Sequence, residues 1–337
     1  MLKFLIVFTS LIFLLTLDIS YSWKNGPSGD ARTDEDHPSC EIIPYSTHDW
    51  VADQARALLP EQERKWLDDN KKLYLLGTEA PDNSEIPDSC NAPNNGYDDR
   101  SSGHSVKWNS DFSAFFIDSN GNKHDRAAFR AKEEYLKAQS AIRQGQLSDA
   151  AFYAGAMAHY IGDTSQYGHS VDFEHHHSDY EGIISTRTDS FEEGVFESDI
   201  LADGLTEIDA YDAVVIISKS TAEGEGDIKS AEWMDINYNN RNEEYFDSVG
   251  ASLNLGVNTL ADVLHTLYVN NEEFITNPDS VDELEPLIYT VKEGDTLGSI
   301  AREFLGDGRR WRTIWVANKD IIDNPSNLQI GMQLVIP

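Results

Sequence analysis

The chain has 337 residues, of which 40% are hydrophobic and 25% charged, so it can bury a core and is neither disordered nor collagen-like. At about 150 residues per domain, this length predicts about two domains. The formal net charge is −33, from 59 acidic and 26 basic residues. Because like charges repel, we expect no nucleic acid partner, and binding to an anionic membrane surface is disfavoured.

Residues 1–22 have the pattern of a secretory signal peptide. Lys3 gives a basic start, residues 5–17 are almost entirely apolar, and Ser20 and Ser22 are the small residues that a signal peptidase reads. The apolar run is shorter than the roughly 20 residues that span a bilayer. We therefore expect cleavage after Ser22, an exported protein, and Trp23 as the mature N-terminus.

Most of residues 48–267 carry apolar side chains at helical spacing, which predicts an all-α domain. Helices are expected over 48–59, 126–144, 149–161 and 245–268. Residues 189–227 are rich in Glu, Asp and Gly, and we expect surface loops there around one short helix near residues 213–217. The predicted organisation is a signal peptide (1–22), a helical domain (23–270), a linker (271–286) and a C-terminal domain (287–337).

The C-terminal segment is predicted to be a small βααβ unit. Strands are expected at 287–291 and 333–336, and helices at 297–304 and 311–318. Its acidic and basic residues balance, so the net charge of −33 belongs to the residues before it, mostly to the helical domain.

Two cysteines remain in the exported chain, Cys40 and Cys90. An oxidising compartment favours a disulfide between them. The alternative of two buried free thiols stays open on the sequence alone.

Histidine and carboxylate residues cluster at the spacing of a metal site. His159 and Asp163 are four residues apart, as are His177 and Glu181, so each pair projects from one face of a helix. His169 lies between the two pairs. A single pair would indicate only an incidental surface ion pair, but two pairs this close in sequence predict a metal centre. The adjacent His175 and His176 are not four residues before Glu181, and we expect them to be surface or supporting groups.

Residues 159–169, followed by 177–181, closely resemble the core of the bacterial zinc-dependent phospholipase C family. Upstream, residues 46–50 resemble the first helix of that family, residues 77–82 its segment with a ligating Asp, and residues 102–104 its next His ligand. In that family the mature N-terminal Trp binds zinc through its amino nitrogen and carbonyl oxygen. The resemblance implies nine metal ligands: Trp23, His48, Asp82, His104, His159, Asp163, His169, His177 and Glu181.

The resemblance also implies an all-helical domain that holds three zinc ions in one cleft. One zinc would be held by Trp23, His48 and Asp163, a second by Asp82, His104, His159 and the bridging Asp163, and a third by His169, His177 and Glu181. The implied reaction is the hydrolysis of a phospholipid by water to diacylglycerol and a phosphorylated head group. Asp82 would act as a ligand and as the candidate general base.

Two alternatives remain open at this point. Single-strand nucleases share the fold and the ordered ligands, but they end the motif in His-x3-Asp, whereas this chain has His-x3-Glu at residues 177–181. The charge of −33 also disfavours a polyanionic substrate. The second alternative is a non-catalytic, zinc-stabilised envelope protein.

Residues 289–301 and 318–337 closely resemble the two ends of a LysM module, which binds polymers of N-acetylglucosamine such as peptidoglycan or chitin-like glycans. The implied groove is lined by Gly294, Asp295, Thr296, Leu297, Asn324, Pro325 and Ile330. Alternatively, Leu297 and Ile330 are core residues. Taken together, the sequence predicts a secreted, extracellular or envelope-associated lipid hydrolase that acts at a membrane surface and is tethered to a glycan.

Overall fold

The computed structural model describes residues 45–82, 90, 92–93, 103–172, 175–189, 195–278, 287–305, 308–319, 321–322 and 324–336. The predicted signal peptide, Trp23 and Cys40 lie outside these residues. The signal cleavage, the zinc-binding role of Trp23 and the pairing of Cys40 with Cys90 therefore stay predictions.

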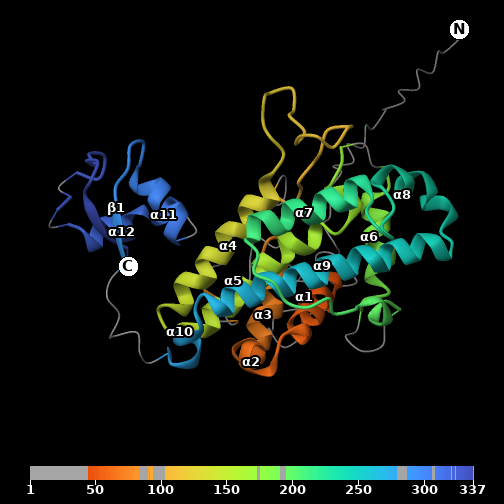
Figure 1. The fold of residues 1–337 in the computed structure, drawn as a ribbon, viewed down its shortest axis with the longest axis horizontal. Coiled ribbons are helices and arrows are strands. Elements are labelled where there is room, and N and C mark those ends of the chain that lie inside the picture. Colours follow the sequence, from red (N-terminus) through yellow and green to blue (C-terminus); the bar gives the residue numbers. More distant parts are fainter. Residues whose placement is uncertain are drawn as a thin grey trace, which may run out of the picture.

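The described residues confirm the predicted fold class, an all-α body followed by a small two-stranded unit (Figure 1). The α-helices of the first part are α1 (Thr47–Leu58), α2 (Glu61–Asp69), α3 (Lys71–Glu79), α4 (Arg126–Ile142), α5 (Leu147–Asp163), α6 (His177–Ser185), α7 (Ala210–Glu223), α8 (Ala231–Asn237), α9 (Glu243–Val269) and α10 (Glu272–Thr276). Short 3-10 helices are η2 (Tyr167–His169), η3 (Glu197–Asp199) and η4 (Tyr238–Asn240). None of the helices in the described ranges is both long and apolar enough to cross a membrane.

Helix α5 is the centre of the helical body, and it contacts α1, α3, α4, α7 and α9. From Ala154 to its end at Asp163 every side chain is buried, because the helix is covered on all sides. Two glycines allow the closest approach. A Cβ atom at Gly155 would lie 1.9 Å from the carbonyl oxygen of Tyr74 in α3, and one at Gly77 would lie 2.0 Å from that of Phe152. Only glycine fits at these two positions.

Helix α7 is longer than the short helix expected near residues 213–217, whereas residues 200–209 and 224–227 on either side of it are loops, as expected. Both ends of α7 are capped. At its N-terminus Asp209 accepts a hydrogen bond from the backbone N–H of Tyr211, and at its C-terminus Gly224 has a φ of 84°. Its β-branched and hydroxyl residues disfavour a helix by propensity. Burial outweighs this, since Val214 and Ile217 lie in the core.

The C-terminal unit has the predicted βααβ order. It consists of β1 (Leu287–Thr290), α11 (Leu297–Leu305), the 3-10 helix η6 (Gly308–Arg310), α12 (Trp311–Ala317) and β2 (Gln333–Ile336). The strands pair antiparallel, with Tyr289 opposite Leu334, and both side chains lie in a separate core. Helix α11 also contacts α4, where Arg302 Nε lies 3.6 Å from Glu133 Oε1. Helix α10 occupies the first residues of the predicted linker.

We predict that Gly155→Ala destabilises the protein by about 3 kcal/mol, because the new methyl group forces α3 and α5 apart. The measurement is the free energy of unfolding from denaturant titration. Gly298→Ala in α11 is the matched control, since its Cβ would find only contacts of 3.7 Å, and we expect a change of about 1 kcal/mol or less. Equal effects of the two substitutions would contradict the account of close packing.

Candidate metal centre

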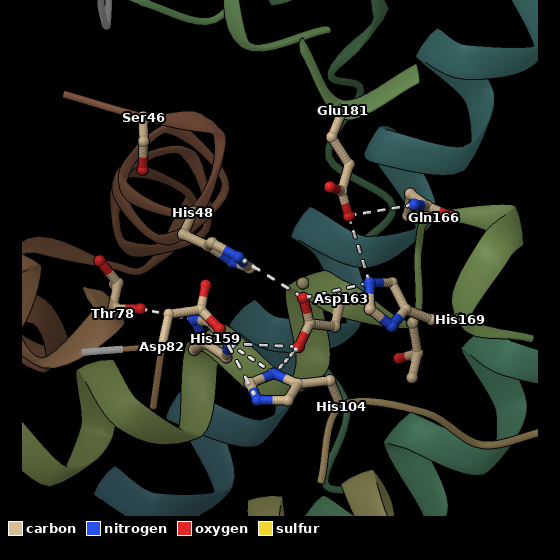
Figure 2. A network of polar contacts seen from close by, with 12 residues as sticks. Ser46, His48, Thr78, Asp82, His104, His159, Asp163, Gln166, His169 and Glu181 are labelled. Carbon is tan, nitrogen blue, oxygen red and sulfur yellow. Dashed lines mark hydrogen bonds and ion pairs between the residues drawn. The ribbon is translucent and has the colours of Figure 1, made fainter. Parts of the chain in front are cut away.

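A fully buried carboxylate, Asp163, is the common contact of four imidazoles (Figure 2). Oδ2 of Asp163 lies 2.8 Å from His104 Nδ1 and 3.2 Å from His159 Nε2. Oδ1 lies 3.5 Å from His48 Nε2 and 3.7 Å from His169 Nε2. The last turn of α5 therefore collects side chains from three other segments of the chain.

His48 reaches this centre because α1 begins one residue before it. The side chains and backbone of Ser46 and Asp49 form a reciprocal capping box that starts the helix. The His48 ring then stacks on the His159 ring, with centroids 3.9 Å apart and an angle of 21° between the ring planes.

The orientation of His159 is set by the end of α3. Its Nδ1 donates to the carbonyl oxygen of Thr78 at 2.6 Å, so Nε2 carries the lone pair and faces the cluster. Asp82 follows directly after α3, and its Oδ1 lies 3.6 Å from His104 Nε2 and 3.7 Å from His159 Nε2. With 19% of its side chain exposed, Asp82 marks the open side of this group.

A third group lies around the start of α6. His177 Nε2 lies 2.7 Å from Glu181 Oε1, and His169 Nε2 lies 3.5 Å from the same oxygen. Gln166 donates to that oxygen at 3.2 Å and accepts a hydrogen bond from the backbone N–H of Gly168. This amide side chain therefore holds Glu181 and the turn before His169 together.

The donor atoms form three groups that can each hold a metal ion, with all donors of a group within 4.8 Å of one another. The groups are His48, His159 and Asp163; Asp82, His104 and His159; and His169, His177 and Glu181. Zinc bonds of about 2.0–2.1 Å in a tetrahedral arrangement separate neighbouring ligand atoms by roughly 3.4 Å, and most separations above are close to this. The side chains present fit zinc. The buried oxygen Oε2 of Glu181 has no hydrogen bond, and a bound metal ion would give it a partner.

For His48, His169 and Asp163, burial and neighbouring charges favour the protonation states that bind metal. Burial lowers the pKa of His48 well below its usual value, and the nearby His159 lowers it further. Burial also lowers the pKa of His169, against the opposing charge of Asp163. For Asp163, burial raises the pKa, but the imidazoles of His159 and His169 and the hydrogen bond from His104 outweigh it and hold the pKa well below the usual range. Neutral imidazoles and an ionised carboxylate are the ligand forms of these groups.

The structure thus brings together eight of the nine ligands that the sequence predicts, and the ninth, Trp23, lies outside the described residues. His159 lies with Asp82 and His104, as the resemblance implies, and it also lies beside His48 and Asp163. Two polar contacts were not predicted from the sequence, those of Gln166 and of the Thr78 carbonyl. Both residues lie within the recognised motifs, but nothing in the pattern marks them as supports of the ligands.

The predicted glycan-binding residues of the C-terminal unit differ in solvent exposure and in hydrogen bonding. Ile330 is 69% exposed, whereas Leu297 is buried in the core and is not available to a ligand. The carboxylate of Asp295 accepts hydrogen bonds from Tyr289 and from the backbone of Lys292, both at 2.7 Å. Thr296 accepts a hydrogen bond at the start of α11, where it caps the helix. The backbone of Gly294 has a φ of 88°, and Asn324 accepts a hydrogen bond from the backbone beyond Pro325.

Comparison with known proteins gives two family matches. The zinc-dependent phospholipase C family model matches residues 47–251, and the LysM domain model matches residues 289–337. Among solved structures, an alpha-toxin of an avian Clostridium perfringens strain is 19% identical with a TM-score of 0.45, over 75% of this chain and 70% of that one. An alpha toxin from Clostridium absonum is 15% identical with a TM-score of 0.42, over 74% and 70%.

Two curated proteins match shorter stretches. The uncharacterised protein YqbP of Bacillus subtilis is 56% identical over 61 residues, which cover 15% of this chain and 28% of YqbP. The potassium binding protein Kbp of Escherichia coli O6:H1 is 39% identical over 49 residues, which cover 14% of this chain and 33% of Kbp. The chain therefore spans a third or less of the length of these relatives.

We predict that Glu181→Gln removes about one bound zinc per chain, because Glu181 belongs to one donor group only. Asp163→Asn should remove more, because its carboxylate contacts imidazoles of every group. The measurement is bound zinc per chain by elemental analysis after dialysis against a weak chelator, with circular dichroism as a check of folding. Equal zinc loss in the two variants would contradict a shared role for Asp163.

A second prediction concerns the pH dependence of stability without metal. Since burial lowers the pKa values of His48 and His169, the folded state binds fewer protons than the unfolded state below about pH 6.5. Stability should therefore be fully present above that pH and should fall by about 2 kcal/mol between pH 7 and pH 5.5. Denaturant unfolding with excess chelator measures this, and a free energy that stays constant or rises would contradict it.

Proposed function

This chain belongs to the zinc-dependent phospholipase C family, and we propose that it is a secreted hydrolase of phospholipids. The bond cleaved is the phosphodiester bond on the glycerol side, and the products are diacylglycerol and a phosphorylated head group. The observation that carries this proposal is the sharing of one buried carboxylate, Asp163, by imidazoles of three adjacent donor groups. Adjacent metal ions are suited to a phosphodiester, whose negative charge otherwise repels a nucleophile.

The donor set supports three zinc ions. Asp163 would bridge between the first two groups, and His169, His177 and Glu181 would hold the third ion. Bound zinc would supply Lewis-acid catalysis, by neutralising the phosphate charge, acidifying water and stabilising the leaving alkoxide. Trp23 completes the first group in this proposal through its amino and carbonyl groups, provided that the chain is cut after Ser22.

Asp82 is the candidate for proton transfer. Among the carboxylates of the centre it is the most exposed, and burial raises its pKa against the opposing charges of His159 and His104. A carboxylate whose proton affinity is raised and that faces the open side can accept a proton from an attacking water molecule. His104 and His159 lie 3.6 and 3.7 Å from this carboxylate, and the Thr78 carbonyl holds His159 in that position.

The charge distribution supports a phospholipid over a nucleic acid. Most of the net charge of −33 belongs to the helical domain that carries the metal centre, so this domain would repel a polyanion. A zwitterionic head group carries no net charge and avoids most of this repulsion.

The C-terminal domain supports a tether to a glycan that contains N-acetylglucosamine, of the peptidoglycan or chitin-like type. The groove in this proposal lies between the loop at Gly294–Thr296 and the loop of Asn324, Pro325 and Ile330. Leu297 supports the groove from the core. Together with the predicted signal peptide, this supports a location outside the cell or at the cell envelope.

The test is a parallel assay of the zinc-loaded mature protein on phosphatidylcholine and on single-stranded DNA, with the products identified. We expect a phosphorylated head group and diacylglycerol from the lipid and no nucleotides. Asp163→Ala should lower lipid hydrolysis at least about 100-fold, because the metal centre loses its shared ligand. Release of nucleotides alone would overturn the proposal in favour of a nuclease, and no hydrolysis of either substrate would favour a zinc-stabilised binding protein.

A further inference from the structure

Helix α8 forms hydrogen bonds to the residues just before His177, a ligand of the third donor group. Asp235 accepts the backbone N–H of His175 at 2.8 Å, and its second oxygen lies 2.8 Å from His175 Nδ1. The next ring, His176, stacks on Tyr238 with centroids 4.2 Å apart and an angle of 13°. His177 follows directly at the start of α6. The segment formed by α8 and η4 therefore lies beside the His177 end of the metal centre, as the neighbouring positions of α6 and α8 show (Figure 1).

The outer face of α8 carries an exposed apolar side chain at this place. Ile236, the residue after Asp235, is 72% exposed, the highest value among the large apolar side chains of the described residues. Trp233, three residues earlier, lies on the same side of the helix and is partly exposed. A single exposed isoleucine needs no explanation, but Ile236 is adjacent to Asp235, which connects α8 to His175, two residues before the ligand His177.

Cations accompany the aromatic rings of this segment. Lys229 Nζ lies 5.6 Å from the centroid of the Trp233 ring, and the Arg241 guanidinium lies 4.4 Å from that of Tyr238. Residues 229–241, which add Lys229 and Arg241 to α8 and η4, contain two basic and two acidic residues and carry no net charge, within a chain of net charge −33. Apolar and aromatic side chains flanked by Lys or Arg are the composition of protein surfaces that lie in the head-group region of a bilayer.

We propose that Trp233 and Ile236 of α8 contact the surface of a zwitterionic phospholipid bilayer and hold the His177 end of the metal centre against it. This proposal rests on the proposed function, since it names the surface on which the hydrolase works. The neutral charge of the segment favours a zwitterionic surface over an anionic one, which the acidic body would repel. Asp235 fixes the position of this contact relative to the site through its two hydrogen bonds to His175.

The test compares Ile236→Ser with Ile117→Ser. Ile117 is 62% exposed and lies between α3 and α4, so the control removes the same apolar groups elsewhere. Binding is measured by flotation of the zinc-loaded protein with vesicles of a phosphatidylcholine analogue in which a CH2 group replaces the glycerol-side ester oxygen. The protein cannot cleave this bond, so binding is measured without hydrolysis. We expect Ile236→Ser to weaken vesicle binding about tenfold, Ile117→Ser less than about twofold, and Ile236→Leu to retain binding.

A second measurement separates surface contact from damage to the site. On a short-chain phosphatidylcholine kept monomeric in solution, Ile236→Ser should retain hydrolysis within about twofold, because no surface is involved. Equal binding losses in the two serine variants, unchanged binding in Ile236→Ser, or an equal loss on monomers and vesicles would each overturn the proposal. If the unsubstituted protein binds the analogue vesicles through Ile236 but cleaves no phospholipid, the surface assignment stands and the proposed function fails.

Discussion

The burial of the Asp163 carboxylate is the constraint on which this structure depends. An ionised carboxylate in the interior is costly unless opposite charges and hydrogen bonds compensate it. Here the compensation comes from α1, α5, the segment before α4, and η2, which supply His48, His159, His104 and His169. The helices can therefore pack around α5 only in an arrangement that points these imidazoles at one place. Metal ions at the same place strengthen the compensation and make it suitable for chemistry on a phosphodiester.

Close packing and site geometry are linked through α3 and α5. Gly77 and Gly155 let the two helices approach until backbone meets backbone. This approach brings the Thr78 carbonyl within 2.6 Å of His159 Nδ1 and fixes which nitrogen faces the centre. The end of the same helix delivers Asp82 to the open side. A contact that looks purely structural thus decides the orientation of a ligand and the place of the candidate general base.

Charge is divided unevenly along the chain, and the division follows the functional parts. The helical body is strongly acidic, the C-terminal domain is balanced, and residues 229–241, which contain α8 and η4, are a neutral stretch within the acidic body. The two balanced regions are those for which we propose contacts with other large structures, a glycan and a lipid surface. The ion pair of Arg302 with Glu133, where α11 meets α4, shows that the balanced domain also contacts the acidic body. Such an exposed pair contributes little stability by itself.

The sequence by itself determined the all-α fold class, the βααβ unit and two pairs of metal ligands, because these depend on spacing, and the family resemblance added the other ligands. A helix places residues four apart on one face, so the spacing alone identifies His159 with Asp163 and His177 with Glu181 as ligand pairs. Only the tertiary structure decided which groups meet. The length of α7, the support of Glu181 by Gln166, and the hold of Asp235 on His175 arise from burial and from contacts between distant segments. Such contacts have no period in the sequence, because each depends on how whole helices pack rather than on the residues next to it.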